Sequence, residues 1–203
     1  MSFDRIKLWT DPVNSGCEET LINKCRPEHY IGLNSISEML TDTITRYAKK
    51  SWSVLEIGSG VGRNLVKLRE AGFRHLKGIE ISTKAIEIGI QAYPEYEKIE
   101  KILAPVEDVI KDIRPVSVIL TSGLLMHLPY DLDWVIEEIS KKATRLIVTN
   151  EAEMGRRESI HVWRRDYQQI FESLGWRQIE YSTGDKCPPL PPWTIKRVFI
   201  PEE

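Results

Sequence analysis

Short apolar runs alternate with segments of helical spacing along most of the chain from Ser53 onward. The apolar runs fall at residues 53–57, 75–81, 98–104, 116–121 and 144–151, and helical spacing returns between most of them. Strands that alternate with helices pair in parallel, because each helix carries the chain back to the same edge of the sheet. We therefore predict an α/β fold, a Rossmann-like doubly wound sheet with helices on both faces.

The last two apolar runs follow a different pattern. Ile179 and Tyr181 alternate after Gly175, and residues 195–200 form a further run after the proline-rich segment 187–193. Proline is excluded from helices and central strands, so this segment is expected to be a loop. Two strands joined without a helix pair antiparallel, which predicts a closing hairpin.

Helix starts are marked by residues that accept a hydrogen bond from free backbone amides. Ser35 and Glu38 have the spacing of a capping box, and Ser82 and Asp131 precede further apolar periodic segments. We expect helices to begin at these three places. Gly72 and Gly175 stand where two helices are expected to end.

The first 33 residues contain two prolines and two glycines and no sustained periodicity. We predict an N-terminal helical arm at 1–33, irregular in its spacing, followed by one domain at 34–203. The arm is too short to fold alone. His29 and Tyr30 near its end either close over a ligand as a lid or simply pack the arm against the domain.

Composition excludes several classes of protein. Among 203 residues, 28 basic and 30 acidic side chains give a formal net charge of -2, without the basic run of a nucleic-acid-binding protein. No stretch approaches the ~18 uninterrupted apolar residues that span a membrane, so we expect no membrane span. The first residues lack the apolar core of a signal peptide, so we expect none. Cys17, Cys25 and Cys187 are too scattered for a disulfide framework or a metal site. We predict a cytoplasmic protein without a metal ion.

Three alternating glycines, Gly58, Gly60 and Gly62, follow the first strand in VLEIGSGVGRN and lead into a helix. Glycine allows a tight turn and a close approach of a ligand to the backbone. A dinucleotide site would place its third glycine at position 63, where Arg63 stands. Glu56, two residues before the first glycine, favours a cationic ligand over a pyrophosphate.

Glu80 ends the second strand, 18 residues after Gly62. An acidic residue about 20 residues beyond such a loop accepts hydrogen bonds from ribose hydroxyls. The loop and this carboxylate together indicate a ligand that contains adenosine and carries positive charge.

These motifs resemble those of the class I S-adenosylmethionine-dependent methyltransferases, over roughly Trp52 to Ile200. The resemblance implies a seven-stranded sheet whose last strand is antiparallel, with S-adenosylmethionine as cofactor. It further implies that Glu56 and the three glycines hold the methionine portion, Glu80 the ribose and Ile81 the adenine. The family often reads Gly-Asp-x-x-x-Leu after its third strand, whereas this chain reads APVEDV at 104–109. Val106 and Glu107 are the expected substitutes for the missing adenine contact.

The segment TSGLLMHLPYD, residues 121–131, follows the fourth strand at the edge of the sheet where ligands bind. It is similar to the S-G-x-L-x-H-x-P stretch of small-molecule and sugar-pathway methyltransferases, most of all the pseudaminic-acid-biosynthesis-associated methylases. Ser122 is expected to contact the cofactor. His127 is either a catalytic base or a histidine that packs at a helix start.

Two further features remain open between a functional and a structural interpretation. Glu151 ends the fifth strand and either lines the substrate side or stays structural. WRRDY at 163–167 is either a substrate-facing cap or a charged helix start.

The predicted reaction is methyl transfer from S-adenosylmethionine to an oxygen or nitrogen of a small polar metabolite, a sugar being one candidate. Alternatives are a non-catalytic S-adenosylmethionine-binding subunit, an RNA or protein methyltransferase, and a nicotinamide-dependent oxidoreductase, against which Arg63 counts. We expect no nucleic-acid or membrane partner, and the oligomeric state stays open.

Overall fold

The computed structural model describes residues 5–153 apart from 16 and 18, residues 161–184 and residues 191–202. These residues form a seven-stranded sheet with the strand order β3-β2-β1-β4-β5-β7-β6. Strands β1 to β5 pair in parallel, and β7 is antiparallel to both of its neighbours. The predicted doubly wound sheet with an antiparallel last strand is confirmed. The strands are β1 Ser53–Ile57, β2 His75–Glu80, β3 Glu100–Leu103, β4 Val116–Ser122, β5 Ala143–Ala152, β6 Trp176–Thr183 and β7 Thr194–Pro201.

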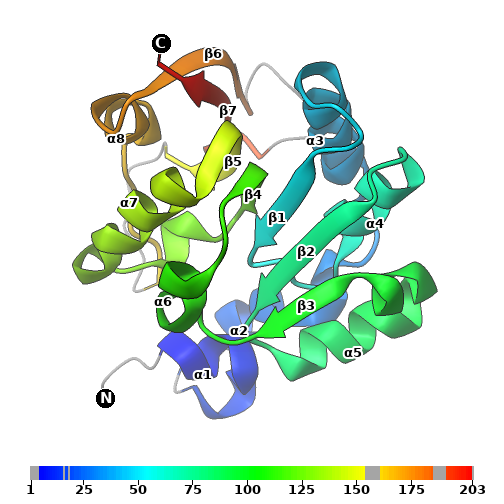
Figure 1. Ribbon diagram of the computed structural model, residues 1–203. Coiled ribbons are helices and arrows are strands. Elements are labelled where there is room, and N and C mark those ends of the chain that lie inside the picture. The colour runs from blue at the N-terminus through cyan, green and yellow to red at the C-terminus, as the bar shows by residue number, and fades with distance from the viewer. Residues whose placement is uncertain (1–4, 16, 18, 154–160, 185–190, 203) are drawn as a thin grey trace.

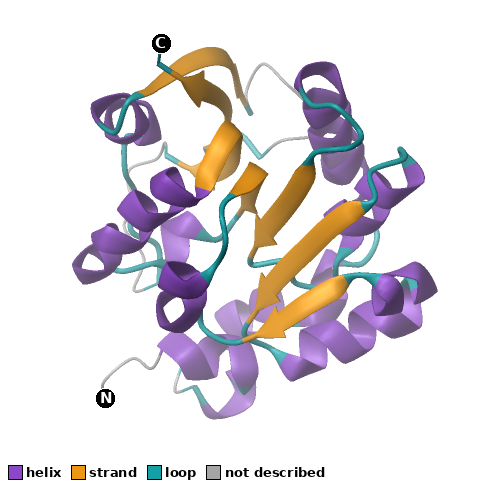
Figure 2. Ribbon diagram, in the orientation of Figure 1, coloured by secondary structure: helices purple, strands orange, loops and turns teal. Residues whose placement is uncertain are grey.

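Helices cover both faces of this sheet (Figure 2). One face carries α3 (Asn34–Tyr47), α4 (Arg63–Glu70) and α5 (Thr83–Ala92). The other carries α6 (Val106–Val109), α7 (Asp133–Lys142) and α8 (Tyr167–Ser173). Short 3-10 helices connect them: η1 Pro12–Asn14, η2 Pro27–Tyr30, η3 Pro94–Lys98, η4 Ile110–Asp112, η5 Leu125–His127 and η6 Tyr130–Leu132.

The continuous apolar runs of the central strands follow from this double cover. In β4, Ile119 packs into the core under α7, whereas Val118 and Leu120 pack into the core under α3 and α4. Successive strand residues point to opposite faces, so a strand covered on both sides has no polar alternation.

The helix starts agree with the sequence in part. The Ser82 hydroxyl accepts a hydrogen bond from the amide of Ala85 at 3.2 Å, as predicted. The capping box is wrong: α3 begins at Asn34, so Ser35 lies inside the helix and makes no cap. The cap at Asp131 is also wrong, because the chain after Pro129 first makes the 3-10 turn η6 and α7 starts only at Asp133.

The arm contains two short helices, α1 (Arg5–Thr10) and α2 (Glu19–Cys25). Figure 1 shows both near the carboxyl ends of β1, β2 and β3. The predicted helical arm is confirmed. The positions of its helices were not predicted, because six or seven residues give less than two turns and little periodicity. No helix among the described residues has the length and apolar character needed to cross a membrane. Most of the predicted proline-rich loop lies outside the described residues.

Candidate active site

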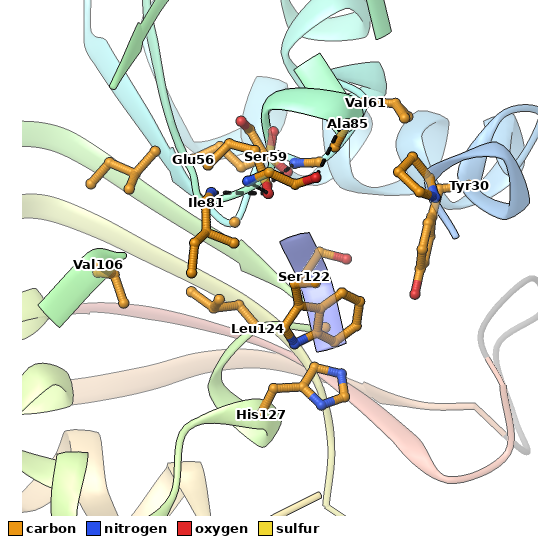
Figure 3. A pocket seen from close by; sticks show the side chains of 18 of the residues that line it. Tyr30, Glu56, Ser59, Val61, Ile81, Ala85, Val106, Ser122, Leu124 and His127 are labelled. Carbon is orange, nitrogen blue, oxygen red and sulfur yellow. Dashed lines mark hydrogen bonds between the residues drawn. The ribbon is translucent and has the colours of Figure 1, made fainter. Parts of the chain in front are cut away.

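The carboxyl ends of β1, β2 and β4 open into a cavity of about 220 Å3. The glycine loop, the start of α6 and the loop after β4 form its walls, and the arm supplies the remaining side. In Figure 3, Ile81 and Val106 lie on one side of the pocket and Tyr30 of the arm lies on the other. Ser122 at the end of β4 and His127 in η5 lie between them. The topology therefore brings together most of the residues predicted from separate motifs.

The three glycines of the loop have left-handed backbones, with φ of 72° at Gly58, 54° at Gly60 and 73° at Gly62. A Cβ at Gly60 would meet no atom within 4 Å, so this position faces open space. A Cβ at Gly62 would lie 2.3 Å from the ring of Tyr96. Gly60 lines the pocket, whereas Gly62 does not and is required instead by the packing of η3 on the loop.

Glu56 is buried at the floor of the pocket, and the Asn64 side-chain amide donates to its Oε1 at 2.6 Å. Arg63 and Ser37 fix the Asn64 amide: Nη1 of Arg63 donates to the Ser37 hydroxyl, which donates to Oδ1 of Asn64, each at 2.7 Å. The other carboxylate oxygen, Oε2, has no hydrogen-bond partner among the described residues. Burial raises the pKa of Glu56 to about 8.

Glu80 bridges the glycine loop and the end of β2 through backbone amides. Its Oε2 accepts from the amide of Gly60 at 2.6 Å, and its Oε1 accepts from Ile81 at 3.0 Å and Ser82 at 2.9 Å. Burial raises the pKa of this carboxyl above its ordinary value. A carboxylate offers about four acceptor sites, so a bound ribose would have to share those that the backbone uses.

These residues fit a cation that contains adenosine. The unpartnered oxygen of Glu56 is a ready acceptor for an ammonium group, because a buried carboxylate oxygen is costly to leave unpaired. The open space at Gly60 admits a ligand against the backbone. Ile81 and Val106 add an apolar surface for an aromatic base. S-adenosylmethionine has these three properties.

The two expected substitutes at the third strand separate in the structure. Val106 lines the pocket and is buried. Glu107 is not among the lining residues, because its carboxylate forms an ion pair with Arg5 of α1. This ion pair ties the arm to the start of α6.

His127 lies in η5 and lines the pocket although it is only 7% exposed. Its Nδ1 is 2.7 Å from the backbone carbonyl of His161. A carbonyl only accepts, so Nδ1 carries the ring proton and Nε2 keeps a lone pair. Burial lowers the pKa of His127 to about 4. The hydrogen bond to the His161 carbonyl opposes this shift, and charge repulsion from the His161 side chain and Arg5 adds a smaller lowering. The imidazole is therefore neutral at pH 7.

Residues from the arm and from the first turn of α4 complete the pocket, and the sequence analysis did not single them out. Trp9 packs its ring against His127 at 4.8 Å between centroids. A lone tryptophan in an arm without periodicity gives no signal of its position. Asn64, by contrast, directly follows the glycine motif at a helix start, where a side chain faces the loop. The pocket residues that were not predicted include Arg5, Trp9, Cys25, Pro27, Ser59, Val61, Asn64, Ile79, Ala85, Leu124, Met126 and Leu128.

Glu151 was open between a substrate-lining and a structural position. It is fully buried and is not among the pocket-lining residues described. Its carboxylate lies under the loop after β4 and accepts from the amides of Leu124 and Met126. Asp166 in the WRRDY segment caps α8 by accepting from the amide of Gln169 at 3.0 Å, which is the helix-start interpretation.

Comparison with known proteins is consistent with this site. Residues 55–144 match the family described as methyltransferase domain. No curated protein matches the sequence. Magnesium protoporphyrin IX methyltransferase from Synechocystis, solved with bound S-adenosylmethionine, is similar at 14% identity and a TM-score of 0.72, over 99% of either chain.

Two other solved structures share the fold. A TehB-like S-adenosylmethionine-dependent methyltransferase from Corynebacterium glutamicum matches at 17% identity and a TM-score of 0.60, over 82% of this chain and 88% of that one. An O-methyltransferase family protein from Burkholderia thailandensis matches at 10% identity and a TM-score of 0.67, over 92% and 61%.

The fold is the Rossmann-like fold of the class I methyltransferases. Residues 55–144 are a methyltransferase domain, and structures solved with S-adenosylmethionine or S-adenosylhomocysteine share its fold, so these findings support an S-adenosylmethionine-dependent methyltransferase. The predicted fold, enzyme class and cofactor are thereby confirmed.

Proposed function

We propose that this methyltransferase is a cytoplasmic enzyme that methylates an oxygen or nitrogen atom of a small polar metabolite, a sugar being one candidate. The observation that carries the proposal is a neutral imidazole, His127, held in one tautomer at the wall of the cofactor pocket. Within the family, the S-G-x-L-x-H-x-P resemblance of residues 122–129 favours the subgroup associated with pseudaminic acid biosynthesis.

The glycine-loop side is assigned to the cofactor. Bound S-adenosylmethionine supplies a methyl group on a positively charged sulfur, which an acceptor lone pair attacks. Glu56 attracts the cofactor's ammonium group, and the open space at Gly60 lets the cofactor approach the backbone. Gly58 lines the pocket beside it and is the other proposed contact of the loop. The other proposed contacts are Glu80 to the ribose, Ile81 and Val106 to the adenine, and Ser122 and Tyr30 at the sides. Gly62 and Glu107 act indirectly, through Tyr96 and Arg5.

His127 is assigned as the base that takes the proton from the acceptor. Its Nδ1 donates to the His161 carbonyl, so Nε2 is the nitrogen that can receive a proton. A general base contributes typically 10²–10⁴-fold, whereas alignment of the reactants contributes about 7–11 kcal/mol. Loss of His127 is thus expected to slow the reaction without abolishing it.

A small acceptor is favoured by the size and cover of the pocket. The cavity is about 220 Å3, and Trp9 and Arg5 of α1 lie at its edge. The net charge of -2 offers no electrostatic attraction to RNA.

The test is methyl-donor turnover against a panel of small hydroxyl and amine compounds, with His127→Asn beside the wild type. We expect acceptor-dependent turnover, and a loss of about 10²–10⁴ in kcat for His127→Asn at unchanged cofactor affinity. Cofactor binding without turnover on any compound, RNA or protein would instead indicate a non-catalytic binding subunit. Label transferred to RNA or protein would overturn the small-acceptor assignment.

A further inference from the structure

Two buried polar side chains that do not line the pocket, Glu151 and Arg165, form hydrogen bonds to the main chain of the loop that carries His127. We propose that Glu151 and Arg165 are positioning residues, which fix the main chain of residues 124–126 and through it the direction of the His127 imidazole. This inference rests on the proposed role of His127 as the base.

Glu151 contacts the loop with both carboxylate oxygens. Oε1 accepts from the amide of Leu124 at 3.2 Å, and Oε2 accepts from the amide of Met126 at 3.3 Å. The side chain is 0% exposed and does not line the pocket. A buried carboxyl group is costly unless it is hydrogen-bonded, and here it satisfies amides that a surface loop would leave to water.

Arg165 holds the carbonyl between those two amides. Its Nη1 donates to the carbonyl of Leu125 at 3.3 Å and to that of Trp163 at 2.9 Å. Its Nε donates to Asp133 at the start of α7 at 2.7 Å. The guanidinium thus links the loop to α7, and its geometry is fixed by three acceptors at once.

His161 and Trp163, just before Arg165, also form hydrogen bonds to this loop. The amide of Trp163 donates to the carbonyl of Met126 at 2.7 Å, and the carbonyl of His161 accepts from Nδ1 of His127. Every residue from Leu124 to His127 therefore has a polar group bound by Glu151 or by the segment 161–165. Hydrogen bonds at each of these residues fix the conformation of the loop main chain and therefore the orientation of the His127 ring.

The test substitutes each positioning residue and follows the His127 side chain itself. In Glu151→Gln one oxygen becomes an NH2 group, which cannot accept from the loop amide that it faces, while the volume is kept. In Arg165→Lys the charge is kept but the planar fork is lost. Nuclear magnetic resonance titration of the imidazole in the full-length protein, assigned by His127→Asn, reports the hydration of His127 without any need for turnover.

We expect the pKa of His127 to rise by at least one unit toward 6.5 in Glu151→Gln, because a loosened loop hydrates the ring. Burial raises the pKa of Glu151 to about 7, and loss of any negative charge that its carboxyl carries would lower the pKa of His127. A rise in the pKa of His127 therefore reports repositioning rather than electrostatics. His161 and Arg5, the charged or titratable groups that act on His127, are left unchanged. Arg165→Lys is expected to shift the pKa in the same direction by less.

Glu153→Gln is the matched control. Glu153 lies two residues further along and forms a buried ion pair with Arg197 at 2.8 Å. Within the part of the chain that the structure describes, its hydrogen bonds go to Arg197 and Trp193 and not to the His127 loop. We expect a loss of stability without a shift at His127. An unchanged His127 pKa in Glu151→Gln, or an equal shift in Glu153→Gln, would overturn the proposal.

Measurements of methyl-transfer activity then distinguish a failure of this inference from a failure of the proposed function. With an acceptor identified, Glu151→Gln is expected to lower kcat about tenfold at an unchanged KM for the cofactor. If His127→Asn loses no activity, the base assignment fails, while the titration still decides whether Glu151 and Arg165 orient the ring.

Discussion

The two ends of the pocket are built in different ways. At the glycine-loop end, the hydrogen bonds described for the side-chain carboxylates of Glu56 and Glu80 come from residues 60–82, and one oxygen of Glu56 is left for a ligand. At the His127 end, the contacts join the arm, the loop after β4, the end of β5 and the segment 161–165. There the buried carboxylate, Glu151, turns both oxygens toward protein amides.

This difference suggests that the cofactor end binds one fixed ligand, whereas the His127 end is the part of the pocket in which the acceptor can differ. At the cofactor end the two carboxylates are held by local contacts, and the distant residues that support the glycine loop are mainly Ser37 and Tyr96. This end therefore depends less on the packing of distant segments. The contacts at the His127 end come from segments far apart in the sequence. Small changes in the packing of these segments would therefore move the side chains that face the acceptor and favour a different acceptor. The predictions below test whether the two ends are as separate as their contacts suggest.

Gly62→Ala is expected to have the largest effect. The added Cβ would collide with the Tyr96 ring at 2.3 Å, in a backbone with a φ of 73° that alanine disfavours. Overpacking and the left-handed backbone together should lower the free energy of unfolding by about 4 kcal/mol. Chemical denaturation measures this loss.

Gly60→Ala is the matched control for that substitution. Its φ of 54° imposes a similar backbone cost of about 1–2 kcal/mol, but no atom lies within 4 Å of the new Cβ. Stability should fall less than in Gly62→Ala, while cofactor affinity falls strongly because the open space is filled. Equal destabilisation by both variants would contradict the separate roles of the two glycines.

Acid stability tests the His127 end. Burial lowers the pKa of His127 from its ordinary 6.5 to about 4, so below pH 6.5 the unfolded chain binds a proton that the folded chain does not. Stability should therefore fall as the pH drops from 6.5 to 4, by up to about 3 kcal/mol from this group.

The contribution of His127 is isolated by comparing the wild type with His127→Gln in denaturation experiments across this range. Glu56 and Glu151, whose pKa values are raised to about 8 and about 7, act in the opposite direction and are common to both proteins. Parallel curves for the two proteins would show that His127 is not buried as a neutral ring.

The same contrast between local and long-range contacts explains what the sequence could predict. The strand, glycine turn and helix at 53–72 are dictated by neighbouring residues, and so are the places of Glu56 and Glu80. The caps at Ser35 and Asp131 failed because tertiary contacts and a 3-10 turn shift helix starts by one or two residues. Trp9 and Glu151 meet the His127 loop only through the tertiary fold, for which the spacing of one sequence carries no signal.

Glu56→Gln tests whether the cofactor end is built for a cation. With a pKa of about 8, Glu56 is mostly protonated at pH 7, and a bound ammonium group favours its ionised form. Cofactor binding should release a proton, and affinity should rise as the pH increases toward 8. Glu56→Gln should lose the proton release and about 2 kcal/mol of binding free energy, roughly 30-fold in affinity.

Calorimetry in buffers of different ionisation enthalpy measures both quantities. Glu107→Gln serves as the control, because the Glu107 side chain pairs with Arg5 and is not itself among the pocket-lining residues described. Its cofactor affinity should stay within about threefold of the wild type, or less than 1 kcal/mol. A larger loss would return Glu107 to the adenine contact predicted from the sequence.

Two helix caps, one near each end of the pocket, provide the smallest and most closely matched comparison. Ser82 caps α5 beside the glycine loop, and Asp166 caps α8 next to Arg165, which contacts the His127 loop. Replacement of either by alanine should lower the free energy of unfolding by about 1 kcal/mol. Only Ser82 lines the pocket, so calorimetry should find a reduced cofactor affinity in Ser82→Ala and none in Asp166→Ala. Reduced affinity in Asp166→Ala would mean that α8 and the glycine loop are coupled through the sheet, and that the cofactor end is less independent than its local contacts imply.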